Sequence, residues 1–269
     1  MRGLIVTADD FGASVAVNEA VERSHLDGIL TAASLMVAGD AAVDAVARAK
    51  AMPSLGVGLH LVLVEGKPVL PPDQIPALVD HTGRFRIDMA RAALRMFADP
   101  RARAQLAAEI EAQFAAFAAT GVPLDHVNAH KHFHLHPTIA STVLKIGGRY
   151  GMTAIRAPLE RGDHGIEAWW ARLLQRRMRR AGMLVPDQVV GLTWTGAFDA
   201  QRMRRAIGDL PPGLTEIYTH PATADTYRGS APGYRYRDEL AALLDPAVMA
   251  LIDRNGISNG HFAYHQTPS

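Results

Sequence analysis

The stretch GLIVTADDFG, residues 3–12, decides how the rest of the sequence is interpreted. Its first half, Leu4–Ala8, is a short and mostly apolar run of the kind that forms a buried strand. A helical pattern over Val15–Leu26 and a turn at Gly28 follow it. A buried strand followed by a helix is the repeating unit of a parallel α/β sheet, so the opening of the chain predicts that class of fold.

The remainder of the chain continues this alternation. Helical patterns cover Ala41–Ala51 and Pro100–Thr120, and the second of these ends at Gly121 and Pro123. About eight strands with helical crossovers predict a parallel sheet, either closed or open, and the 269 residues fit one α/β barrel domain. The further strand-like runs are Ala32–Val37, Gly56–Val64, Leu124–Ala129, Thr153–Arg156, Val189–Trp194, Thr215–Thr219 and Ile257–Phe262.

The composition excludes several classes of function. Lys and Arg total 28 against 27 Asp and Glu, so no strong net field favours a nucleic-acid partner. The absence of cysteine excludes disulfides, thiolate zinc sites and cysteine nucleophiles. The N-terminal apolar run is too short for a signal peptide, and no window of about 18 apolar residues could span a membrane. We therefore expect a cytoplasmic, soluble domain of enzyme size.

Polar side chains stand where several predicted strands end. Asp9 and Asp10 follow the first strand, and His60 lies within or at the end of the third. His130 follows the fourth strand, and His220 follows the seventh. Active sites of barrels built from βα units form where strands end and loops begin, so these residues are expected to meet at one rim. The segment from Glu65 to about Asp99, rich in proline at its start, is expected to form a lid-like loop over that rim.

The adjacent carboxylates of Asp9 and Asp10 are costly to hold together unless a cation or a proton compensates them. One of them could instead cap the helix that follows. One carboxylate with two imidazoles is a common ligand set for Zn, Mn, Fe or Co, and is less typical for Mg. Such an ion lowers the pKa of its water and polarises a carbonyl, and a second carboxylate beside it could act as general base.

The segment NAHKHFHLHP, residues 128–137, holds four histidines, which cannot all bind one ion. In an extended segment, His130, His132, His134 and His136 would alternate onto one face. We therefore expect one ligand, with some of the other three contacting substrate. A lone histidine inside an apolar strand, such as His60, is more often a hydrogen-bonded core residue than a metal ligand.

Taken together, TADDFG (residues 7–12), GLHL (58–61) and NAHKHFHLHP resemble the YdjC-like carbohydrate deacetylases almost from end to end. The resemblance implies a distorted (β/α) TIM-like barrel, with residues 1–269 forming one domain. It also implies hydrolytic removal of acetyl from an N-acetylated amino sugar. The implied cofactor is one divalent ion, for which we expect Zn or Mg ahead of Mn, Co or Fe.

Carried over position by position, the resemblance makes Asp9 the general base and makes Asp10, His60 and His130 the metal ligands. His220, at a strand end, is our candidate for the acid that protonates the leaving amine, with His132 or His134 as alternatives. Substrate contacts are expected from His132, His134 and Arg156, although Arg156 could equally form a surface salt bridge. Members that act on sugar oligomers carry Asp-Ser-His where this chain has Asn128, Ala129 and His130.

The motifs ILTAASLMV (29–37), GLHLVLVEGKPVLPP (58–72), DHVNAHKHFHLHP (125–137) and TEIYTHPA (215–222) are similar to the branch of this family associated with hopanoid biosynthesis, HpnK. That branch implies conversion of an N-acetylglucosaminyl hopanoid to its glucosaminyl form. The alternatives are the same reaction on soluble chitooligosaccharides, an iron oxygenase with two histidines and one carboxylate, and a non-catalytic sugar- or lipid-binding protein.

Residues 167–185, EAWWARLLQRRMRRAGMLV, combine tryptophan with five arginines in a helical pattern. A basic amphipathic helix with tryptophan is typical of helices that lie on a membrane surface. We favour the alternative, an outer barrel helix with an apolar inner side and solvated arginines. A lipid-linked substrate would favour peripheral contact with the inner face of the cytoplasmic membrane, and a homodimer is a further expected assembly.

Overall fold

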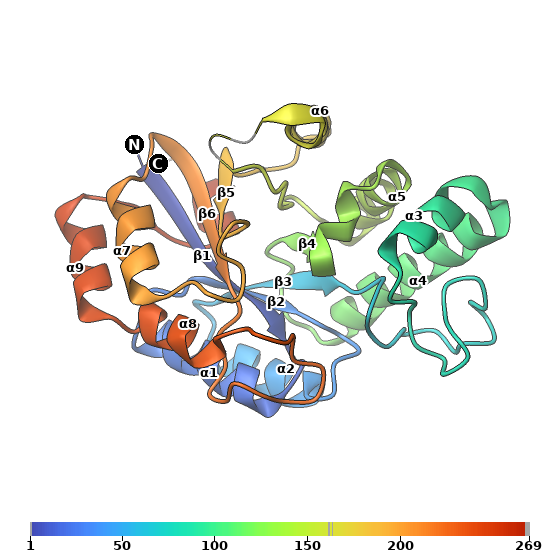
Figure 1. Ribbon diagram of the computed structural model, residues 1–269, viewed down its shortest axis with the longest axis horizontal. Helices are drawn as coiled ribbons and strands as arrows, with labels where there is room; N and C mark the ends of the chain where they lie inside the picture. The colour runs from blue at the N-terminus through green and yellow to red at the C-terminus, as the bar shows by residue number, and fades with distance from the viewer. Residues whose placement is uncertain (1, 161, 163, 267–269) are drawn as a thin grey trace.

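The computed structural model describes residues 2–160, 162 and 164–266. Within them, seven strands form one parallel sheet in the order β4-β3-β2-β1-β6-β5, and β7 pairs with the start of β1. Helices surround the outside of this sheet (Figure 1). The expected parallel α/β class is therefore correct.

Strand β1 (Arg2–Phe11) is the centre of the sheet. It pairs along most of its length with β6 (Gly213–Thr219), and from Thr7 onward with β2 (Ala32–Leu35). Its apolar residues, including Ile5, are buried, as expected for a strand covered on both sides. The longest strand therefore ends deep inside the molecule, with Asp9 and Asp10 at that end.

Helix α1 covers Val15–Leu26, as the sequence predicts. The side chain of Ser14 caps its N-terminus by accepting from the Val17 backbone N–H. Because Ser14 takes this position, neither Asp9 nor Asp10 is needed as a helix cap. The alternative role considered for the aspartate pair is therefore wrong.

The remaining elements follow the predicted alternation, but β2, β3, β4, β5 and β7 are all shorter than the strands expected from the sequence. Their bounds are α2 Ala42–Ala51, β3 Gly56–Leu61, α3 Met89–Ala98, α4 Pro100–Ala119, β4 Val127–Ala129, η1 His130–Leu135, α5 Pro137–Gly147, η2 Gly148–Tyr150, α6 Gly165–Arg180, β5 Gln188–Val190, α7 Ala200–Gly208, α8 Tyr236–Leu243, α9 Pro246–Arg254, β7 Ser258–Asn259 and α10 Phe262–Gln266.

The sheet is a half-barrel, because β4 and β5 do not pair within the described residues. Residues 153–159 lie between these two strands and form only isolated bridges, where the sequence predicts a strand over Thr153–Arg156. The Arg156 N–H donates to the Val127 carbonyl at 3.0 Å, and the Val189 N–H donates to the Leu159 carbonyl at 2.8 Å. The segment follows the path of a missing strand and carries Arg156 inward.

The expected lid, residues 65–99, is partly helical and is fastened to helix α4. The backbone N–H groups of Val69 and Leu70 donate to the Glu109 carboxylate at 2.8 and 3.0 Å. Ile75 and Phe85, within the same segment, are buried. The segment is therefore packed against the domain, and its action as a lid stays a prediction.

Candidate metal centre and active site

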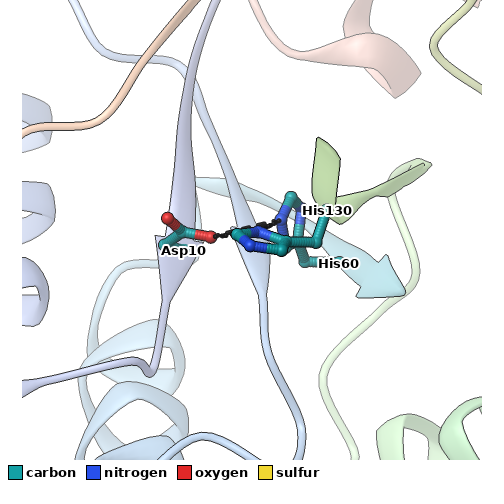
Figure 2. A group of neighbouring side chains, drawn as sticks. All are labelled: Asp10, His60 and His130. Carbon is teal, nitrogen blue, oxygen red and sulfur yellow. Dashed lines mark hydrogen bonds and ion pairs between the residues drawn. The ribbon is translucent and has the colours of Figure 1, made fainter. Parts of the chain in front are cut away.

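The side chains of Asp10, His60 and His130 converge at the carboxyl ends of β1, β3 and β4 (Figure 2). One ligand atom from each lies within 4.8 Å of the other two. Asp10 Oδ1 is 3.2 Å from both His60 Nε2 and His130 Nδ1, and the two nitrogens are 3.4 Å apart. The rim expected from strand ends therefore exists, and these three residues, called here the metal centre, occupy it.

An irregular backbone turns Asp10 toward the two histidines. The pairing of β1 with β2 shifts register between Ala8 and Phe11, which marks a bulge. Asp10 itself has a φ of 62°, a left-handed conformation that is rare for a residue other than glycine. Such strain persists where the surrounding structure fixes it, and it is common at functional sites.

The charges of the metal centre stabilise one another. Burial alone would raise the pKa of Asp10, but the nearby imidazoles of His130 and His60 hold it well below its usual range. Burial would lower the pKa of His60, yet the hydrogen bond to Asp10 and the charge of Asp9 raise it. The pocket thus favours a carboxylate paired with positive charge, which either a proton or a metal ion can supply.

The donor set fits a divalent metal ion. His60 Nδ1 lies 2.7 Å from the Asn128 side-chain oxygen and donates to it, so in the neutral imidazole the lone pair is on Nε2, which faces Asp10. One carboxylate oxygen and two imidazole nitrogens then face a common point, the arrangement typical of Zn, Mn, Fe or Co sites. The three residues predicted as ligands from the sequence could therefore bind one ion together.

Asp9, the neighbour of Asp10, points into the interior and is 2% exposed. The Arg156 guanidinium binds both of its carboxylate oxygens, and the Asn128 amide donates to Oδ1 at 2.9 Å. Burial would raise the pKa of Asp9, but the charge of Arg156 and then that of His60 hold it well below its usual range. Asp9 is therefore ionised and fixed in orientation at neutral pH.

Arg156 has a different position from the one expected. Its side chain is completely buried, and its guanidinium also donates to Glu216 Oε1 at 2.7 and 2.9 Å. The guanidinium carbon lies 4.7 Å from the centre of the Tyr218 ring. Arg156 is not among the residues that line the cavity at the metal centre, so we revise the expected substrate contact: Arg156 holds Asp9 in place.

The histidine segment is not extended, which changes the expected alternation of its side chains. His130–Leu135 forms the short 3₁₀ segment η1, which is kinked at Lys131 and His132, because both residues adopt left-handed backbone conformations. His134 is consequently buried completely, and its Nε2 donates to the Arg156 carbonyl at 2.7 Å. Burial lowers the pKa of His134 to about 4. The substrate contact expected of His134 is therefore revised to a structural bond.

A cavity of about 350 Å³ opens beside the metal centre and contains Asp9, His132 and His220. His220 lies between the rings of Tyr218 and Tyr234, with ring centres 5.6 and 5.4 Å away. Its Nδ1 is buried and has no hydrogen-bond partner among the described residues. The cavity thus places an uncommitted imidazole in the same space as the aspartate.

His132 lines the same cavity but is held by Tyr218. Its Nε2 is 3.2 Å from the Tyr218 hydroxyl, which also contacts Thr195 at 2.6 Å. Burial and the charge of Arg156 hold the pKa of His132 well below its usual range. A neutral imidazole is a poor proton donor, so between the two histidines His220 is the better candidate for the acid.

A sequence model of the family described as YdjC-like protein matches residues 3–254. The chain belongs to the YdjC-like family. Among the family's relatives, it is 34% identical to the carbohydrate deacetylase of Brevibacillus brevis over 82% of both chains. It is 29% identical to the chitooligosaccharide deacetylase of an Enterobacter species over 96% of this chain and 97% of that one.

A solved structure from Enterococcus faecalis, described as a putative cellobiose-phosphate cleavage protein, has a similar fold. That structure superposes with a TM-score of 0.81, at 24% identity, and covers 98% of both chains. At this identity the similarity shows a common fold and no more.

The aromatic side chains that line this cavity were not predicted from the sequence. Tyr218, Tyr234 and Tyr236 line the cavity together with Thr195 and the loop residue Pro232. Tyr218 stands two residues before His220 on β6, so alternation along a strand could have placed both on one face. Thr195, Pro232 and Tyr234 lie in two irregular loops, which carry no periodic signal, and Tyr236 is the first residue of α8.

Proposed function

We propose that this protein is a metal-dependent carbohydrate deacetylase that hydrolyses the N-acetyl group of an amino sugar. The observation that carries the proposal is the convergence of three metal-ligand atoms beside a cavity that also contains Asp9. The names of the relatives agree with this chemistry. The sequence motifs that resemble deacetylases supply the residues of the metal centre.

Each residue has a defined task in the proposed reaction. Asp10, His60 and His130 would hold the ion, which when bound lowers the pKa of water and polarises the acetyl carbonyl. Asp9 accepts the proton of the attacking water while Arg156 and Asn128 keep its carboxylate ionised and aligned.

His220 donates a proton to the sugar nitrogen as the C–N bond breaks. The tyrosines on either side of its ring restrict its orientation. The products are acetate and the free amine of the sugar, so the atoms of one water molecule are divided between them. Asp9 and His220 therefore act as base and acid within one cavity.

The substrate that we favour is a lipid-linked sugar such as an N-acetylglucosaminyl hopanoid. A second cavity, of about 420 Å³, shares His132 and Leu192 with the first and is lined by Ala168 and Ala171 of α6. On the same helix, Trp169 is 60% exposed. The lining also includes the polar residues Glu160, His164 and Thr193, and the aglycone could lie against its apolar part while the sugar reaches the metal centre.

The exposed side of helix α6 also supports peripheral contact with a membrane. Its other side packs against the domain, as in an ordinary outer helix of a barrel. Leu174 and Met178 are buried, and the Trp170 indole donates to the Leu135 carbonyl at 2.9 Å. Trp169 and Leu173 remain outside, at 60% and 41% exposure. No helix in the described part of the chain is long and apolar enough to cross a bilayer. Flotation with anionic vesicles at low salt tests this membrane contact, and the absence of binding would contradict it.

The second candidate substrate is a soluble chitooligosaccharide, which the name of the Enterobacter relative favours. Mass spectrometry of acetyl loss from the glycosylated hopanoid and from chitobiose, each with and without chelator, separates the two. We expect chelator-sensitive loss from the hopanoid. Oxygen-dependent turnover would instead indicate an iron oxygenase, and binding without turnover a non-catalytic protein.

A further inference from the structure

A continuous chain of buried polar side chains leads from the metal centre to the opposite end of the sheet. The Asn128 amide nitrogen donates to Ser34 Oγ at 2.9 Å, and Ser34 Oγ is 3.0 Å from His126 Nε2. His126 Nδ1 is 3.0 Å from Asp125 Oδ2. All four of these side chains are buried. None of them belongs to the proposed catalytic residues.

The far end of this chain is a second group of one aspartate and two histidines, called here the Asp125 cluster (Asp125, His126 and His261). His261 Nδ1 lies 2.6 Å from Asp125 Oδ1. The backbone N–H groups of Phe262 and Ala263, at the start of α10, donate to the same carboxylate at 3.2 and 2.9 Å. The carboxylate is therefore fixed by four donors.

Two glycines of GVGLHL, residues 56–61, make room for this chain. A Cβ atom on Gly58 would come within 2.5 Å of the His126 ring, and one on Gly56 within 2.6 Å of Asp125 Oδ2. On another side, the Phe262 ring stacks on His126 with centres 4.3 Å apart. The GxG pattern therefore serves close packing of the imidazole inside the sheet. This second observation indicates that the position of His126 is closely specified.

The hydrogen bonds fix the direction of every proton in the chain. The two amide hydrogens of Asn128 go to Asp9 and Ser34, so Ser34 accepts from Asn128. The only proton of Ser34 is then free to go to His126 Nε2, and the Nδ1–H of His126 goes to Asp125. This assignment leaves no two hydrogens facing each other.

The orientation of the Asn128 amide matters to the metal centre. With its nitrogen toward Asp9 and Ser34, its oxygen accepts from His60 Nδ1, so the neutral His60 imidazole has its lone pair on Nε2. In the flipped orientation an amide hydrogen would face His60 Nδ1 and move the imidazole proton to Nε2. A protonated Nε2 cannot bind a metal ion, so the flip would disable a ligand.

We propose that Asn128 is a positioning residue of the metal centre, and that the buried Asp125–His126–Ser34 chain selects its amide orientation. The inference rests on the proposed metal site and extends it by naming residues at the opposite end of the sheet that control it. Asn128 acts on two groups at once, because the same amide that orients His60 also holds Asp9.

Titration with Co²⁺, followed by its visible absorption, tests the proposal without any substrate. Partners that orient metal ligands are typically worth about 10- to 100-fold in affinity. We expect Ser34→Ala to raise the Co²⁺ dissociation constant about tenfold, and Asn128→Ala to raise it by close to 100-fold. The matched control is Ser24→Ala, because Ser24 Oγ is equally buried but has no partner among the described residues. The control should bind Co²⁺ as the wild type does.

The tautomer of His126 provides a second test that needs no variant. Nitrogen-15 NMR of the wild-type protein should show the neutral imidazole protonated at Nδ1, and an Nε2–H tautomer would overturn the proposed chain. If the Co²⁺ dissociation constant of Ser34→Ala lay within twofold of the wild-type value, the role of the Asp125–His126–Ser34 chain would be contradicted, and the proposed function would not be affected. A wild-type protein that binds no Co²⁺ would contradict the proposed function, and the inference would fall with it.

Discussion

The metal centre and the Asp125 cluster each contain one aspartate and two histidines, at opposite ends of one sheet. In the metal centre, three ligand atoms face one another within 4.8 Å. In the Asp125 cluster, the carboxylate oxygens accept two imidazole N–H groups and two backbone N–H groups. The first arrangement could hold a cation, whereas in the second the carboxylate already accepts four hydrogen bonds. The difference lies in the donors that surround each aspartate, not in the aspartate and histidines themselves.

The backbone also differs between the two groups: left-handed residues occur around the metal centre and not in the Asp125 cluster. Among the described residues, the non-glycine residues with left-handed conformations are Asp10, Glu65, Lys131 and His132, and all four line the cavities at the metal centre. The backbone of the Asp125 cluster has none. Strain gathers where side chains are aimed at a reaction site, and it is absent where they only complete the fold.

The largest contrast is expected in metal affinity. Asp10→Asn removes a charged ligand atom, and we expect its Co²⁺ dissociation constant to rise by more than about 100-fold. Asp125→Asn changes only the far end of the buried chain, so we expect a rise of no more than about tenfold. Titration of both variants measures the contrast. Equal losses of affinity would show that the two groups are not distinct in the way described.

Asp9→Asn should separate catalysis from metal binding. General base catalysis typically contributes about 10²- to 10⁴-fold, so we expect kcat to fall by that range. Because Asp9 is not a ligand, Co²⁺ affinity should stay close to that of the wild type. Acetate release and Co²⁺ titration on the same preparation check both statements. Loss of binding together with activity would place Asp9 among the ligands.

His220→Asn should alter the pH profile more than any other property. If His220 is the acid, kcat falls about 100-fold and the alkaline limb of the pH–rate profile disappears. The metal should be retained, because His220 does not belong to the metal centre. An unchanged profile would remove His220 from the mechanism and leave His132 as the acid to be tested.

The smallest expected effect is on stability at the Asp125 cluster. Burial raises the pKa of Asp125, but the hydrogen bonds from His126 and His261 outweigh it and hold the pKa well below its usual range. A lowered folded-state pKa stabilises the fold above the unfolded value of about 3.9, and this contribution is lost as the pH falls through the folded value. Asp125→Asn should therefore destabilise by about 1–3 kcal/mol at pH 7.

Denaturant unfolding of wild type and Asp125→Asn at several pH values measures this difference. The gap in the free energy of unfolding should be constant from pH 7 to about pH 5 and should narrow below about pH 3.9. A gap that widens in acid would mean that the pKa of Asp125 is raised in the folded protein. The catalytic rate at pH 7 should change much less than in Asp9→Asn.

The sequence predicts those features that depend on periodicity and strand ends. Helix α1 has its predicted bounds, Val15–Leu26, because a clear apolar pattern begins just after Ser14. Asp10, His60 and His130 converge because the carboxyl ends of neighbouring parallel strands meet at one edge. Such features are local or topological, and one sequence contains enough to specify them.

Features that depend on side-chain pairing inside the sheet were not predictable in the same way. The sequence places Arg156 at the end of a predicted strand. Its burial depends on Asp9 and Glu216, which are far away in sequence. His134 is turned inward by left-handed residues that no propensity predicts. The Asp125 cluster depends on a pairing with His261, 136 residues later in the chain. In each case the partner is defined only by the folded structure.

The central claim is that Asp10, His60 and His130 bind one divalent ion. Anomalous diffraction at the zinc edge, from crystals grown with Zn²⁺, tests it most directly. We predict a single strong peak at the metal centre, within bonding distance of the Asp10 carboxylate, His60 Nε2 and His130 Nδ1. A peak at the Asp125 cluster instead, or full occupancy elsewhere with the metal centre empty, would contradict the account.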